Sequence, residues 1–310
     1  MFGSQPLATR PPAGQRRPRI AIVLGAGAAR GWAQIGVMRA LKAADFPIDM
    51  VVGTSIGAVV GGCFCAGKLD QLAEFATSLT PRRVFGLIDL SLSGGGLIGG
   101  NRLRERLEAE LAGLRVEGLP IPFAACATEV PSGRETWLTT GDLTTAIRAS
   151  YALPGVFEPV YFMGRWMVDG ALVNPIPVTL ARAMGADRVI AINMTVDALV
   201  RGPATPDETA PPPPPERARG FWPWRADRST VTPGPSLAAV LADAFNITQD
   251  RIARSHLAGD PPDAMITVRM GGFSLFDFLR AAEMIAVGEK AVRRAMPDLI
   301  EQFPEGADAG

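Results

Sequence analysis

The chain has 310 residues, of which 47% are hydrophobic, and its 31 basic side chains are balanced by 31 acidic ones. That length can bury one large core or two modest ones, and a net charge of zero excludes bulk attraction to nucleic acid. The three cysteines, Cys63, Cys65 and Cys126, lack the spacing of a disulfide framework or a zinc site. We therefore expect reduced core thiols in a cytoplasmic protein.

The N-terminal segment 1–18 is rich in proline and arginine and contains no apolar run. This composition predicts a disordered basic tail and not a secretory signal, which needs a hydrophobic stretch. Residues 50–67 form an uncharged run close to the length of a membrane span. Because five of these eighteen residues are glycine, a buried strand followed by a buried helix explains the run better.

A glycine-rich loop at 25–31 lies between a predicted buried strand at 20–24 and a predicted helix at 32–44. Its small residues let the backbone turn several N–H groups toward a bound anion or oxyanion. A dinucleotide site is the competing interpretation, but Arg30 occupies the sixth position of G-x-G-x-x-G and Gly31 comes one place late. A Walker A loop is excluded because the Gly-Lys-Ser/Thr ending is missing.

The second loop, Gly53-Thr54-Ser55-Ile56-Gly57, joins a short apolar strand at 50–52 to an apolar helix at 58–66. A serine between two glycines at such a junction is typical of a nucleophile elbow, whose sharp turn exposes the hydroxyl. Gly53 and Gly57 suit positions where a side chain would collide with the neighbouring strand or helix. An ordinary serine in a glycine-rich turn stays open as the alternative.

The two loops follow consecutive strands that we expect to be parallel, so both should open on the same edge of the sheet. One loop would then supply N–H donors for an oxyanion, and the other would supply the nucleophile. This division of labour is what acyl transfer requires.

The proton acceptor for Ser55 is the next requirement, and in most serine hydrolases it is a histidine. The chain has a single histidine, His256, far downstream on a predicted amphipathic helix, so we expect a carboxylate base instead. Asp169 is the candidate, because it follows the short apolar strand 166–168 and precedes Gly170. Carboxylates at strand ends face the crevice of α/β proteins, although an aspartate in a tight turn would fit the same residues.

Three motifs in this order resemble those of one family. They are the loop 25–31 with its Arg-Gly ending, the G-x-S-x-G elbow, and Asp-Gly-Ala at 169–171, with further agreement at 93–97, 149–160 and 168–177. In these residues the chain is similar to bacterial patatin-like phospholipases of the branch related to neuropathy target esterase. The resemblance covers roughly residues 19–195.

The resemblance implies an α/β fold, a three-layer α/β/α patatin-like sandwich with a mainly parallel central sheet. It implies that Ser55 and Asp169 form a dyad that cleaves acyl esters of lipids or phospholipids through an acyl-enzyme. The N–H groups of Gly27 and Ala28 would form the oxyanion hole, and Arg30 would support that loop. It implies no metal and no organic cofactor. The glycines expected to supply backbone shape are Gly25, Gly31, Gly53, Gly57 and Gly170.

The chain departs from the family pattern at three positions. Ala26 and Ala28 replace glycines of the family's run, and Gln34 stands where a histidine is common. Because alanine disfavours positive φ, the two alanines could narrow the acyl pocket or shift the donor N–H groups. Two alternatives to a lipid hydrolase therefore stay open. One is a low-activity or regulatory protein that binds lipid, and the other is an acyltransferase with the same dyad.

We expect one catalytic domain over residues 19–300, interrupted by a proline-rich insertion at 201–235 and followed by a frayed tail at 301–310. Aromatic residues beside arginines in the insertion suit peripheral contact with the inner face of a membrane or packing on the protein's own surface. Both interpretations stay open. The residues concerned are Phe221, Trp222 and Trp224. Downstream, the pattern predicts a helix at 237–257, a strand at 265–268 and a helix at 275–296.

Overall fold

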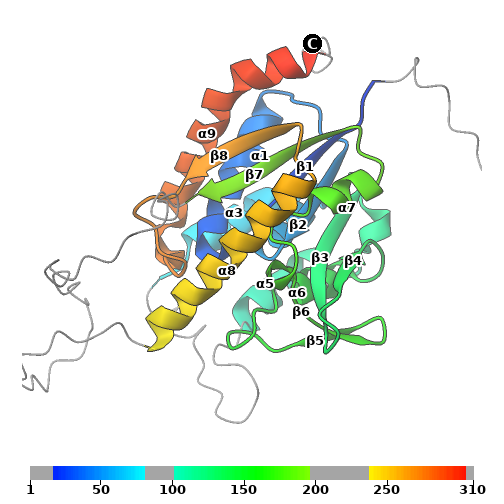
Figure 1. Ribbon diagram of the computed structural model, residues 1–310, viewed down its shortest axis with the longest axis vertical. Helices are drawn as coiled ribbons and strands as arrows, with labels where there is room; N and C mark the ends of the chain where they lie inside the picture. Colours follow the sequence, from blue (N-terminus) through cyan, green and yellow to red (C-terminus); the bar gives the residue numbers. More distant parts are fainter. Residues whose placement is uncertain (1–16, 81–100, 196–236, 305–310) are drawn as a thin grey trace, which may run out of the picture.

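The computed structural model describes residues 17–80, 101–195 and 237–304. Most of the tail 1–18, the segment 93–97 and the insertion 201–235 lie outside the described residues, and so do Phe221, Trp222 and Trp224. The described part alternates strands with helices, which is typical of an α/β protein (Figure 1).

The strands of the described segments form one sheet of eight, and the helices lie on its two faces. The strands are β1 (Ile20–Leu24), β2 (Met50–Thr54), β3 (Phe123–Val130), β4 (Glu135–Leu138), β5 (Val160–Phe162), β6 (Arg165–Asp169), β7 (Arg188–Thr195) and β8 (Ala264–Arg269). The α-helices are α1 (Ala33–Ala43), α2 (Ile56–Cys65), α3 (Leu69–Thr77), α5 (Asn101–Leu111), α6 (Leu143–Tyr151), α7 (Val178–Ala183), α8 (Leu237–Gly259) and α9 (Ala281–Gln302). Short 3₁₀ turns at the site are η1 (Ala28–Trp32) and η3 (Gly170–Leu172).

The centre of the sheet is parallel, in the order β3-β2-β1-β7-β8. Every residue of β1 and β2 is buried, as expected for parallel strands that are covered on both faces. At the β3 side of the sheet, β4 and β6 pair antiparallel with β3, and β5 pairs antiparallel with β6. The expected mainly parallel sheet is therefore confirmed, with an antiparallel extension.

The register along β3 brings the ends of β2 and β6 together. β2 pairs with β3 as far as Cys126, and β6 pairs with β3 from Val130 back to Ala127. β4 occupies the other edge of β3 over 125–128, so β2 and β6 share one edge. Because they run in opposite directions along that edge, their C-terminal ends meet head-on, with Ser55 after one end and Asp169 at the other.

Two unequal helical layers cover the sheet and make the expected three-layer sandwich. On one face α1, α2, α3, α6 and α9 pack on side chains such as Ile22 and Leu24 of β1. On the other face α7 packs against Ala21 and Val23, and α8 lies across the same face (Figure 1).

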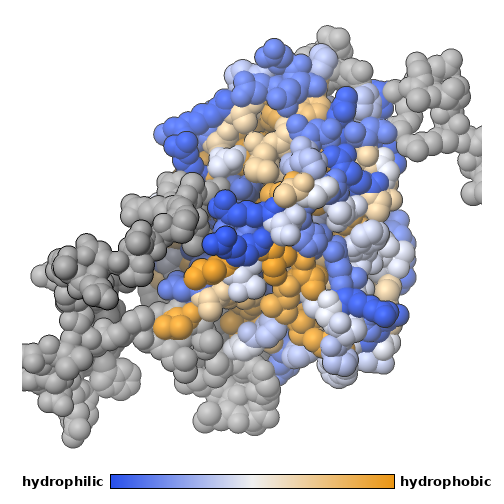
Figure 2. All heavy atoms as spheres, viewed as in Figure 1, coloured by the Kyte–Doolittle hydropathy of each residue, from blue (hydrophilic) through white to orange (hydrophobic). Residues whose placement is uncertain are grey.

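α8 is only lightly packed against the rest of the protein. None of its described side chains is buried, and Ala253 and Leu257 in its C-terminal half are the positions that pack on the core. Val240 and Ile247 are 45% and 49% exposed, and Figure 2 shows hydrophobic atoms along this N-terminal half of the helix. By contrast, α9 buries a full apolar stripe against the protein.

Element ends differ in places from the sequence-based expectation. The closing helix starts at Ala281 rather than at 275, and it runs to Gln302, with Phe303 buried against Phe46. It therefore extends into the segment 301–310 that we expected to fray, because a buried aromatic ring anchors its end. Within the described ranges, no helix is long and apolar enough to cross a bilayer.

Candidate active site

The elbow between β2 and α2 holds Ser55 in a strained backbone conformation. Its φ and ψ are 58° and −124°, a region that residues with a side chain rarely occupy and that costs about 1–3 kcal/mol. The residues two positions on either side of Ser55 must be glycines, because there is no space for a Cβ at either position. A Cβ on Gly57 would lie 2.1 Å from the carbonyl oxygen of Leu24, and one on Gly53 would lie 2.4 Å from the carbonyl oxygen of Gly57. The turn is therefore as sharp as the sequence predicted.

Asp169 faces Ser55 from the end of β6. Ser55 Oγ donates a hydrogen bond of 2.6 Å to Asp169 Oδ2, and the residues are 7% and 2% exposed. The other carboxylate oxygen, Oδ1, accepts from the N–H of Ala171 at 2.8 Å. The backbone of Asp169 is fixed as well, because its carbonyl accepts from Thr128 Oγ1 and its N–H donates to the carbonyl of Ala152. The carboxylate thus has a defined position.

Burial raises the pKa of Asp169 from 3.8 to about 7. The physical cause is desolvation, which penalises the charged carboxylate, and the hydrogen bonds from Ser55 and Ala171 oppose it only in part. A carboxylate with a pKa near 7 can accept a proton from the attacking nucleophile and give it to the leaving group at the same pH.

The glycine-rich loop after β1 presents unpaired N–H groups near the elbow. Gly27 has φ 157° and ψ 14°, and Ala28 has φ 48°. Among the described residues, no acceptor is hydrogen-bonded to the N–H of Gly27 or Ala28. The N–H groups on either side are occupied: Ala26 donates to the carbonyl of Pro175, and Ala29 donates to the carbonyl of Leu275. This pattern leaves two adjacent donors free for a ligand.

Hydrogen bonds and close packing hold this loop in place, and Gly170 after β6 is packed as closely. Gln34 Nε2 donates to the carbonyl of Gly25 at 2.6 Å. Arg30 Nε donates to the carbonyl of Phe273 at 3.1 Å. A Cβ on Gly31 would meet the side chain of Ile56, so the loop packs directly on the first residue of α2. Gly170 likewise has no room, since a Cβ there would lie 2.2 Å from the carbonyl oxygen of Cys126.

The comparisons with known proteins agree with this geometry. The model of the family described as patatin-like phospholipase matches residues 22–182. The chain belongs to the patatin-like phospholipase family. NTE-family proteins of Mycobacterium tuberculosis and Mycobacterium bovis are 32% identical to it, over 91% of this chain and 92% of their own length.

Other relatives of this patatin-like chain are much longer proteins. Lysophospholipase NTE1 of Mycosarcoma maydis is 30% identical over 70% of this chain, which spans 12% of that protein. The crystal structure of VipD from Legionella pneumophila matches with a TM-score of 0.55 at 13% identity, and covers 91% of this chain and 67% of VipD. That likeness shows the fold alone. The family membership confirms the resemblance, the fold and the class of lipid-hydrolysing serine esterases.

His256, the alternative base, lies in the last turn of α8, whereas the hydroxyl of Ser55 is bonded to Asp169. Within the described part of the chain, no group of three or more His, Cys, Asp or Glu side chains is gathered for a metal ion. The structure thus pairs Ser55 with Asp169 and not with His256.

Two polar contacts at the patatin-like site were missed by sequence reasoning. Ser150 Oγ accepts from the N–H of Ser55 at 2.9 Å and donates to the carbonyl of Cys126 at 2.6 Å, which ties the elbow to β3. The second is Asn174, whose carbonyl accepts from Thr54 Oγ1 at 2.9 Å and whose side chain donates to Glu135 on β4. The available signal was that Ser150 and Asn174 lie in the family segments 149–160 and 168–177. Glu135 gave none.

Proposed function

We propose that this patatin-like chain hydrolyses acyl esters of lipids, with Ser55 as the nucleophile and Asp169 as the general base. The observation that carries the proposal is the 2.6 Å hydrogen bond between Ser55 Oγ and Asp169 Oδ2. A carboxylate with a pKa near 7 that accepts a hydrogen bond from a buried hydroxyl can take up its proton at neutral pH as the hydroxyl oxygen attacks.

In the acylation step Ser55 Oγ attacks the ester carbonyl carbon while its proton moves to Asp169 Oδ2. The bond between that carbon and the alcohol oxygen then breaks, and Asp169 returns the proton to the leaving alkoxide. The products are a free alcohol and an acyl ester on Ser55. The hydrogen bond from Ala171 to Oδ1 keeps Oδ2 directed at Ser55 throughout.

The negative charge that develops on the carbonyl oxygen needs donors that are already in place. The N–H groups of Gly27 and Ala28 suit this role, because they are adjacent and free of other described partners. One such donor is worth about 3 kcal/mol in the transition state. Ala28 adopts a positive φ of 48°, so the alanine in place of glycine has not prevented the backbone conformation that the loop needs. This supports hydrolysis over the regulatory alternative.

Deacylation reverses these roles. A water molecule attacks the acyl carbon, Asp169 Oδ2 accepts a proton from that water, and the bond to Ser55 Oγ breaks. Asp169 then returns the proton to Ser55, which releases the acid and restores the hydrogen bond of the resting site. An alcohol in place of water would give acyl transfer by the same steps.

The proposal is tested by intact mass after reaction with a fluorophosphonate probe, which labels activated serines. We expect one adduct on the wild type and none on Ser55→Ala, with Ser132→Ala as the matched control, because Ser132 is exposed in a turn. Asp169→Asn should label at least about a hundredfold more slowly. An unlabelled wild type, under conditions that label a control hydrolase, contradicts the proposal.

The lipid substrate is tested separately by product analysis with phospholipid and lysophospholipid vesicles. Hydrolysis predicts free fatty acid in amounts equal to the alcohol released. Accumulation of a new acyl ester when glycerol is added would support the acyltransferase instead. Retained lipid binding without turnover would support the regulatory alternative.

A further inference from the structure

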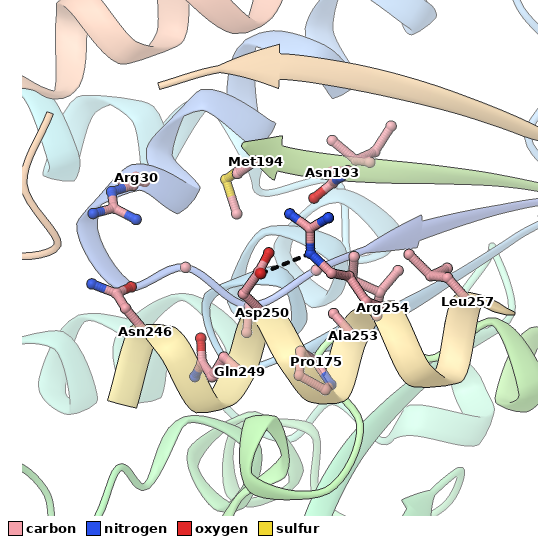
Figure 3. Close-up of a pocket in the computed structure, with 15 residues that line it drawn as sticks. Arg30, Pro175, Asn193, Met194, Asn246, Gln249, Asp250, Ala253, Arg254 and Leu257 are labelled. Carbon is pink, nitrogen blue, oxygen red and sulfur yellow. Dashed lines mark hydrogen bonds and ion pairs between the residues drawn. The ribbon is translucent and has the colours of Figure 1, made fainter. Parts of the chain in front are cut away.

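A cavity lies between α8 and the glycine-rich loop, on the face of the sheet that α8 covers (Figure 3). Its volume is about 290 Å³, at the lower end of the range for small-molecule sites. The glycine-rich loop and the end of β7 form one wall, and α8 forms the other. Neither Ser55 nor Asp169 lines it, so this space is not explained by the dyad.

Arg30 is the feature of this cavity that requires a partner. The residue is 9% exposed, yet its guanidinium makes one described hydrogen bond, from Nε to the carbonyl of Phe273. No described residue accepts from its two terminal nitrogens. Desolvation lowers the pKa of Arg30, which is the sign of a cation held away from water. A buried guanidinium with free N–H groups can bind an anion, which would supply the missing hydrogen-bond acceptors.

Further donors line the same cavity. Figure 3 shows Asn246 of α8 beside Arg30 at one end, and Arg254 in the middle, where it forms an ion pair with Asp250 at 2.7 Å. The side chains of Asn246 and Gln249 have no hydrogen-bond partner among the described residues. The lining therefore offers amide and guanidinium N–H groups in excess of acceptors, with two cations against one carboxylate.

Two more carboxylates act on Arg30 through their charge, Asp277 and Asp243. Neither is hydrogen-bonded to it. Asp277 accepts from the N–H of Ser274 and forms an ion pair with Arg280, while Asp243 is exposed on α8. These acids support the charge of Arg30 from a distance and leave its terminal nitrogens free.

We propose that the cavity between α8 and the glycine-rich loop binds a phosphate group, held by Arg30 with Asn246 and Arg254. A phosphate offers several acceptor oxygens to a planar guanidinium and its neighbours, and so matches a lining rich in donors. The cavity has room for a small polar group attached to the phosphate. The ligand is therefore a soluble phosphate ester or the phosphate of a lipid headgroup.

Binding there would also affect the glycine-rich loop. Arg30 lies in η1, two residues after Ala28, and Gly25, Ala26 and Gly27 line the cavity themselves. A phosphate on Arg30 would therefore restrain the segment that carries the two free N–H groups. The proposed binding does not depend on ester hydrolysis, so it can be measured on a protein with no turnover.

The test is isothermal titration calorimetry on the full chain carrying Ser55→Ala, at constant ionic strength in chloride. The probes are inorganic phosphate, glycerol 3-phosphate and glycerophosphocholine, a phosphodiester without acyl chains. Added to this background, Arg30→Met and Asn246→Leu remove cavity donors. Arg254→Gln removes a cavity cation, and Arg251→Gln removes an exposed cation from the same helix as its matched control. Circular dichroism checks that each variant folds.

We expect at least one probe to bind with a 1:1 stoichiometry, and Arg30→Met to weaken it at least about tenfold, as for loss of a charge-assisted hydrogen bond. Arg254→Gln and Asn246→Leu should weaken it less, and Arg251→Gln should not change it. Binding of inorganic phosphate and glycerol 3-phosphate alone identifies a soluble ligand, whereas binding of the diester identifies a lipid headgroup. No binding at millimolar concentration overturns the proposal. Equal weakening by Arg251→Gln and Arg254→Gln overturns it too.

Discussion

Replacing Asp169 by asparagine should remove activity and at the same time make the fold more stable at neutral pH. Asparagine has the same shape, and its Oδ1 can still accept from the N–H of Ala171. What it removes is a buried negative charge. The folded protein holds that charge at a cost, because burial raises the pKa of Asp169 from 3.8 to about 7.

The magnitude follows from the shift of the pKa. A difference of about 3 units, at 1.36 kcal/mol each, gives about 4 kcal/mol. The folded-state pKa is the raised one, so the protonated carboxyl stabilises the fold fully below about pH 4. That contribution is lost as the pH rises through about 7. The substituted asparagine would not titrate, so the free energy of unfolding of Asp169→Asn minus that of the wild type should rise by about 4 kcal/mol between pH 4 and pH 8.

The measurement is urea unfolding of both proteins at pH 5, 6, 7 and 8, followed by circular dichroism. The difference in unfolding free energy should grow by about 1.4 kcal/mol per pH unit up to pH 7 and then level off. Asp70→Asn serves as the control, because that carboxylate is 76% exposed in a surface ion pair. A difference between wild type and Asp169→Asn that stays constant from pH 5 to pH 8 would refute the reasoning.

Three further outcomes follow from the site. The kcat/KM for a soluble ester should fall about tenfold per pH unit below about pH 7, as Asp169 takes up its proton, and a limb below pH 5 in the pH profile would contradict this assignment. Glu135→Ala should lower kcat about tenfold with little change in KM, because the Asn174 side chain loses the nearer of its two hydrogen-bond acceptors. Glu135→Gln, which keeps an acceptor, and Trp137→Phe, which removes a donor to Glu135 but leaves Asn174 bonded to it, should stay near wild type. Gly57→Ala should cost about 3 kcal/mol or more in thermal or urea unfolding, since its Cβ would meet the backbone of Leu24, whereas Gly118→Ala, with open space around it, should be neutral.

The parts of the site that local sterics specify could be predicted from the sequence. The elbow around Ser55 depends on φ and ψ at one residue and on space at its two neighbours, and all of these are encoded within five residues. The glycine-rich loop is similar, since its turn and its free N–H groups depend on small residues in one short segment. A single, distant histidine was also enough to make a carboxylate the expected base.

The sequence predicted that Asp169 lies next to Ser55, but the position of strand ends in a parallel sheet explains this only in part. We placed Asp169 in the crevice because strand ends in parallel sheets face it, but β6 runs antiparallel to β3. The two residues meet because β2 and β6 approach each other head-on along one edge of β3. They are 114 positions apart in the sequence, and the segment between them carries no local signal of that register.

The sequence by itself determined the family, the layered α/β fold and the two residues of the proposed dyad, because motifs and hydrophobic runs are properties of short segments. Only the tertiary structure decided what surrounds them. It buried Asp169 and so raised its pKa, bonded Ser150 to the elbow and Glu135 to Asn174, and placed α8 beside the glycine-rich loop to form a cavity that Arg30 lines. Desolvation and hydrogen bonding depend on which distant segments come into contact, and that information lies in the packing of the whole chain.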